Sequence, residues 1–70
     1  MKKRLNTAVV FLLRGIAKAG LKDYARAIAD FTKAIRIKPD YAEAYFGRGL
    51  AKYDLNDYNG AIAELDKFRY

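Results

Sequence analysis

Residues 14–36 of the chain read RGIAKAGLKDYARAIADFTKAIR, and residues 48–70 read RGLAKYDLNDYNGAIAELDKFRY. The two stretches align without a gap at an offset of 34 residues. When the comparison is extended to residues 8–36 against 42–70, 12 of the 29 aligned positions are identical. Self-similarity at a fixed period of roughly 20–50 residues is typical of repeat architectures. The sequence therefore predicts two copies of one structural unit.

Each unit has the pattern of two helices joined by a tight turn. Asp23 and Asp57 are predicted to be N-caps of the second helix of each unit. Lys22 and Asn56 fall in the turn, where a left-handed residue is expected and Asn is better tolerated than Lys. Residues 40–43 form an Asp-x-x-Glu capping box ahead of the third helix. The helices are predicted at Thr7–Gly20, Tyr24–Ile37, Tyr41–Asp54 and Tyr58–Phe68.

Two glycines recur inside predicted helices. Gly15 and Gly49 occupy equivalent positions, where Gly costs about 1 kcal/mol relative to Ala. We expect them to allow close approach of two helix backbones, with the small residues Ala27 and Ala61 opposite.

A 34-residue period of two helices resembles the tetratricopeptide repeat (TPR) family. The motifs that carry the resemblance are Phe11-x2-Arg14-Gly15-x2-Lys18, Ala27-x3-Phe31 and Pro39, and then Tyr45-x2-Arg48-Gly49-x2-Lys52 and Ala61-x3-Leu65. Arg and Lys replace the usual Leu and Tyr of the family pattern in both repeats. The resemblance implies an all-α fold of two helix-turn-helix pairs, with four antiparallel helices in right-handed superhelical stacking. The implied divisions are a basic N-terminal tail (1–7), repeat 1 (8–41) and a truncated repeat 2 (42–70) without a C-terminal capping helix.

The resemblance also implies that the first helices of the pairs line a concave groove. The groove residues, which are mostly apolar, are expected to be Val9, Leu12, Ile16, Glu43, Phe46, Leu50 and Tyr53. A second apolar set at the end of the last helix is expected to mediate self-association through Ile62, Leu65 and Phe68. We therefore expect a protein–protein interaction or assembly module that forms a homo-oligomer. The alternative is a fragment of a larger TPR scaffold whose groove binds an apolar or amphipathic peptide.

The net charge of +6 is unevenly distributed along the chain. Residues 1–7 carry +3, residues 8–41 carry +4 and residues 42–70 carry −1. Nucleic-acid binding is a more remote alternative, because the basic residues alternate with apolar ones and no RNA-binding motif is present.

Four basic residues recur in pairs on shared helix faces. The pairs are Arg14 with Lys18, and Arg48 with Lys52. Salt bridges between paired helices, to Asp23, Asp30, Asp57 or Glu64, are the favoured interpretation. A phosphate or acidic-peptide site is the alternative.

The composition argues against an enzyme. The 70 residues contain no Cys, His or Ser, so thiolate and imidazole chemistry are excluded and we expect no catalytic, metal or cofactor site. No apolar run approaches the ~20 residues of a membrane span. Met1–Lys18 resembles a signal peptide only partly, since Asn6 and Thr7 interrupt its apolar stretch. A cytoplasmic protein is therefore the favoured interpretation.

Overall fold

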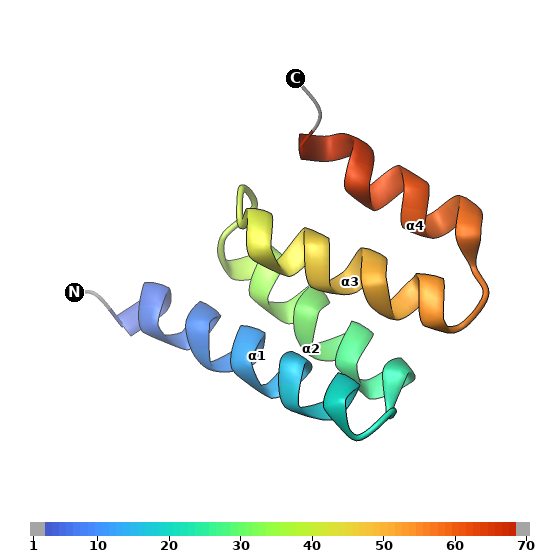
Figure 1. Cartoon of the computed structure of the whole chain (residues 1–70). Helices are drawn as coiled ribbons and strands as arrows, with labels where there is room; N and C mark the ends of the chain where they lie inside the picture. The colour runs from blue at the N-terminus through green and yellow to red at the C-terminus, as the bar shows by residue number, and fades with distance from the viewer. Residues whose placement is uncertain (1–2, 69–70) are drawn as a thin grey trace.

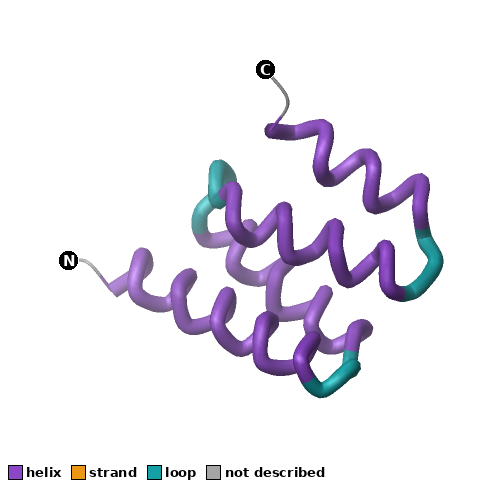
Figure 2. Tube along the Cα trace, in the orientation of Figure 1, coloured by secondary structure: helices purple, strands orange, loops and turns teal. Residues whose placement is uncertain are grey.

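The computed structural model describes the backbone of residues 3–68 and the side chains of residues 7–67. Within residues 3–68 the elements are all helical: α1 (Lys3–Gly20), α2 (Tyr24–Ile37), α3 (Ala42–Asp54), α4 (Tyr58–Leu65) and a 3₁₀ turn, η1 (Asp66–Phe68). Each helix packs antiparallel to the next, with α1 and α3 side by side and α2 behind them (Figure 1). Short loops join the helices (Figure 2). This confirms the predicted all-α fold of two helical hairpins.

The helix boundaries differ from the prediction at three places. The first helix begins at Lys3 rather than Thr7, so residues 3–6 of the predicted tail have helical backbone. The third helix begins at Ala42, one residue later than predicted. The last three residues assigned to the fourth helix tighten into the 3₁₀ turn η1, as helix ends often do.

The centre of the core is the ring of Phe31, which lies on α2 and is 1% exposed. A Cβ atom placed on Gly15 of α1 would lie 2.6 Å from this ring, and one on Gly47 of α3 would lie 2.7 Å from it. Three helices therefore converge on one aromatic side chain. The close approach of two backbones expected at Gly15, with Ala27 opposite, is not what occurs there: the missing side chain makes room for the Phe31 ring.

Small residues make up most of the remaining core. Around Phe31 the buried residues are Ala8, Leu12, Ala27, Ala34, Tyr41 and Ala44. In the second hairpin, a Cβ on Gly49 would lie 3.2 Å from the Cβ of Glu64 and 3.3 Å from the Leu65 side chain. Alanines and glycines bring the helices close together, and they leave little apolar area buried per residue.

The two turns within the hairpins have the same geometry. Lys22 and Asn56 have φ of 65° and 68°, which confirms the expected left-handed residues. The N–H of the following Asp, Asp23 or Asp57, donates to the carbonyl five residues earlier at 2.8 Å. Each Asp side chain then accepts from the N–H three residues on, at 3.4 and 3.0 Å. The predicted N-caps are thus confirmed.

The capping box predicted at Asp40 and Glu43 is wrong. Tyr41 occupies the N-cap of α3 in an extended conformation, and no side chain caps that helix. Tyr41 belongs to the core, so its burial sets the start of α3 and places Asp40 one residue too early to cap. The Asp40 carboxylate instead accepts a hydrogen bond from Lys38 at 3.0 Å.

We predict that Gly15→Ala destabilises the protein although Ala favours helix more than Gly does. The new methyl group would overlap the buried Phe31 ring, and overpacking a core costs about 1–3 kcal/mol. The free energy of unfolding, from urea titration followed by circular dichroism, should fall by about 1 kcal/mol or more. Gly20→Ala is the matched control because a Cβ there meets no atom within 4 Å. Equal stability of the two variants would contradict the prediction.

We predict that Lys22→Gly stabilises the protein. A left-handed conformation costs an ordinary L-residue about 1–2 kcal/mol, part of which Gly gives back through its larger unfolded-state entropy. The expected gain is about 0.5–1 kcal/mol in the free energy of unfolding. Asn56→Gly should gain less, since Asn tolerates this conformation better. A gain for Asn56→Gly that exceeded the gain for Lys22→Gly would refute this account of the turns.

Candidate protein-binding groove

A buried carboxylate joins the two helices of each hairpin. In the first hairpin, Asp30 of α2 is 2% exposed and lies 2.9 Å from Lys18 Nζ and 3.6 Å from Arg14 Nε. Its equivalent in the second hairpin is Glu64 of α4. The predicted salt bridges between paired helices are confirmed at these two acids, whereas Asp23 and Asp57 serve as caps.

The second cluster also links the two repeats. Glu64 lies 2.7 Å from Arg48 Nε and 2.7 Å from Lys52 Nζ. A further Arg48 nitrogen donates to Thr32 Oγ1 of α2 at 3.0 Å. One guanidinium on α3 therefore binds α2 and α4 together, which uses the several N–H donors of Arg.

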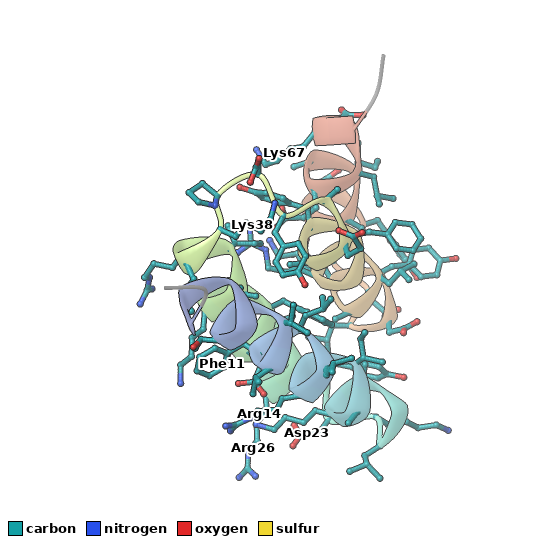
Figure 3. The ribbon with its side chains drawn as sticks, turned by 90° about the vertical axis from the view of Figure 1, so that its left-hand side faces the viewer. Phe11, Arg14, Asp23, Arg26, Lys38 and Lys67 are labelled. Atoms are coloured by element: carbon teal, nitrogen blue, oxygen red, sulfur yellow. The ribbon has the colours of Figure 1, made fainter. Side chains whose placement is uncertain are left out.

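Cations also flank an aromatic ring in each hairpin. The cationic groups of Arg14 and Lys33 lie 5.5 and 5.4 Å from the centre of the Phe11 ring. Figure 3 shows Phe11 and Arg14 projecting from α1 toward the same side of the molecule. Tyr45 is flanked by the equivalent Arg48 and Lys67 at 5.4 and 5.6 Å. Distances below about 6 Å are favourable for cation–π contact. The recurring basic residues thus have partners within the chain, and no phosphate is needed to explain them.

The acid–base balance of Glu64 favours its charged form. Burial opposes ionisation, but the hydrogen bonds and charges of Arg48 and Lys52 outweigh it and hold the pKa of Glu64 below its ordinary value of 4.5. The carboxylate is therefore ionised at neutral pH and acts as a structural anion.

Residues of α1 and α3 line an apolar hollow. It has a volume of about 510 Å³ and is lined by Ile16, Ala42, Glu43, Phe46, Gly47 and Leu50. Phe46 and Leu50 lie one turn apart on α3, and Ile16 comes from α1. These three side chains are each about half exposed, and Glu43 is the one charged residue of the lining. Such a surface is suited to apolar groups, and Glu43 is the one side chain of its lining that can exchange a proton.

A comparison with protein-family models matches the TPR repeat over residues 20–55. This chain belongs to the TPR repeat family. The match spans α2 and α3, the two helices that join one hairpin to the next. Neither the curated proteins nor the solved structures gave a match. TPR repeats are in general protein-interaction modules and are typically not enzymes.

Only part of the predicted groove set lines this hollow. Ile16, Glu43, Phe46 and Leu50 line the hollow, as do Ala42 and Gly47, which the sequence analysis did not select. The residues that do not line it are Val9, Leu12 and Tyr53. Leu12 is 8% exposed because it belongs to the core. The Tyr53 ring contacts Tyr58 edge-to-face at 5.2 Å, and Val9 is exposed on α1.

The predicted self-association residues lie at the end of the second TPR hairpin. Ile62 and Leu65 are exposed on α4, and the Phe68 side chain lies outside the described residues. Val10 and Leu13 on α1 are equally exposed and were not predicted. Their equivalents in repeat 2 are Ala44 and Gly47, the small residues of α3 that lie in the core with Phe31. The replacement of small core residues by large apolar ones is the sequence signal that could have identified Val10 and Leu13 as surface residues.

None of the described helices has both the length and the apolarity required to cross a bilayer. The same part of the chain contains no group of three or more acidic residues arranged to hold a metal ion.

We predict that Glu64→Gln lowers the stability of the protein at neutral pH and makes that stability less dependent on pH in the acid range. The folded pKa of Glu64 is depressed, so its contribution is fully present above the unfolded value near 4.5 and is lost as pH falls through the folded pKa. At pH 7 the loss should be about 2 kcal/mol, because Arg48 and Lys52 lose their counter-charge.

Thermal unfolding between pH 7 and pH 2 measures both effects. Asp40→Asn is the control, since the pKa of Asp40 is also lowered, by a hydrogen bond from Lys38, but the side chain is fully exposed. Its stability should stay close to that of the parent. A Glu64→Gln variant with unchanged stability would show that the cluster adds nothing.

Proposed function

We propose that this chain is a protein-interaction and assembly module that uses its apolar groove and the outer faces of its end helices, and that it associates with copies of itself. One observation carries the proposal. Among the described side chains, twelve large apolar residues are exposed, whereas Phe31 alone is large and fully buried. Folding thus leaves most of the large apolar side chains in water, and patches of this kind mark interaction surfaces.

The uneven distribution of charge along the chain supports a second copy as the partner that covers these surfaces. Residues 8–41 carry +4 and residues 42–70 carry −1, so a head-to-tail order brings unlike halves together, which is the order least opposed by the repulsion between copies of net charge +6. The charge distribution sets orientation, and apolar burial supplies the affinity. A cytoplasmic location is part of the proposal and rests on the lack of cysteine.

The groove itself supports a second candidate function, the binding of an apolar or amphipathic peptide. The hollow measures about 510 Å³, which is the size of a small-ligand or side-chain pocket. Glu43 at its edge favours a peptide with a basic residue beside its apolar side chains.

We predict that Phe46→Asp weakens self-association at least about tenfold, because it places a charge on the exposed apolar surface of α3. Sedimentation velocity at matched concentrations measures the dissociation constant. Ala29→Asp introduces the same charge at an exposed position on α2 and is the matched control. Equal weakening in both variants would contradict the use of this surface. A parent chain that remains monomeric would leave peptide binding as the better function.

A further inference from the structure

The packing of α2 against α3 provides a template for contact between copies. At this joint the Phe31 ring fills the space above Gly47, and Ala44 is fully buried. Thr32 Oγ1 accepts a hydrogen bond from Arg48 at 3.0 Å. The joint therefore consists of a large side chain on α2, small residues on α3 and one polar link beside them.

The same positions occur on outer faces that no described element covers. At an offset of 34 residues, α4 corresponds to α2 and α1 corresponds to α3. On α4 and the adjoining η1, the equivalents of Ile28, Phe31 and Thr32 are Ile62, Leu65 and Asp66. On α1 the equivalents of Ala44, Gly47 and Arg48 are Val10, Leu13 and Arg14. Leu13 is 56% exposed although its equivalent Gly47 lies against the Phe31 ring inside the chain, and Ile62 on α4 is 57% exposed.

The substitutions between the two joints compensate each other. The large Phe31 opposite the absent side chain of Gly47 becomes Leu65 opposite Leu13, so two medium side chains replace one large one. The polar pair changes in charge as well: Asp66 stands at the position of Thr32, and Arg14 stands at the position of Arg48. Size and charge thus match across a joint that the single chain does not form.

Arg14 has the donors for this second role. Its side chain is 54% exposed, and its Nε lies 3.6 Å from the Asp30 carboxylate. Arg48 in the equivalent place already binds Glu64 and Thr32 with different nitrogens. A guanidinium has five N–H donors, so Arg14 can hold Asp30 and the Asp66 of another copy together.

We propose that copies of this chain stack head to tail, with α4 of one copy packed on α1 of the next as α2 packs on α3. The inference rests on the self-association in the proposed function and specifies its surfaces. The contact is heterologous, so each copy keeps one free α1 face and one free α4 face, and the assembly extends as an open chain.

The stacking has a defined effect on the groove. Leu12 of α1 is buried where α1 and α3 lie together, and its equivalent Phe46 on α3 is 52% exposed. The α1 helix of the next copy covers Phe46 in the same way. Ile16 stays half exposed beside α3, so its equivalent Leu50 stays open in the stack and remains available to a peptide.

Mixing two blocked variants tests the inference. Leu13→Asp blocks the α1 face and Ile62→Asp blocks the α4 face, both at exposed positions outside the hollow. Each variant alone should be monomeric at concentrations where the parent associates, with self-association at least about tenfold weaker. An equimolar mixture should give a species of two chains and no larger one, because one intact face of each kind remains. Circular dichroism confirms that both variants fold, and Ala29→Asp serves as the charge-matched control.

The other outcomes are distinct. A mixture that stays monomeric overturns head-to-tail stacking, and so does association of either variant alone. If Phe46→Asp abolishes association and Leu13→Asp does not, self-association stands and this arrangement is wrong. If the parent is monomeric throughout, self-association and stacking both fail.

Discussion

The Phe31 ring determines how close α1, α2 and α3 can come. A buried aromatic side chain with glycines on two neighbouring helices lets three backbones meet around it, and any added carbon would collide with the ring. The first hairpin and the joint to the second are therefore built on one contact. The orientation of α3 relative to α1 follows from it, and so does the hollow between them.

Two buried salt-bridge clusters hold the helices of each hairpin together in a protein whose apolar core is small. Asp30 and Glu64 are nearly inaccessible, and each is held by cations from the facing helix of its hairpin. Such clusters add modest net stability, since desolvation offsets much of the attraction, but removing one partner is costly. They explain why Arg and Lys stand at positions where the family pattern has Leu and Tyr. The change is made in both repeats because the acid, the two cations and the ring act together.

Local chemistry made much of the fold predictable from the sequence. Turns and helix caps depend on the conformational preferences of a few neighbouring residues, so they can be predicted without knowing the tertiary structure. This applies to the turn residues Lys22 and Asn56 and to the caps Asp23 and Asp57. The start of α3 was not predictable in the same way, because the burial of Tyr41 decided it and burial depends on tertiary packing.

The groove was predicted only in part for the same reason. Helical spacing places Leu12 and Phe46 at equivalent positions, yet Leu12 is buried in the core and Phe46 lines the open hollow. The difference comes from neighbours in space, which a repeat alignment does not contain. Comparing the two repeats position by position recovers part of this information, because some exposed apolar residues have covered equivalents: Val10 is 51% exposed, whereas its equivalent Ala44 is fully buried.

We propose that a second copy of the chain covers the outer faces of α1 and α4 that are exposed in a single copy. Binding that favours the folded state raises apparent stability with concentration. The most direct measurement is the midpoint of thermal unfolding of the unmodified chain over about a hundredfold range of protein concentration. The account predicts a rise of several degrees, because association adds up to about 2.7 kcal/mol over such a range and small domains shift by about 4–8 °C per kcal/mol. A midpoint that does not change with concentration would contradict it.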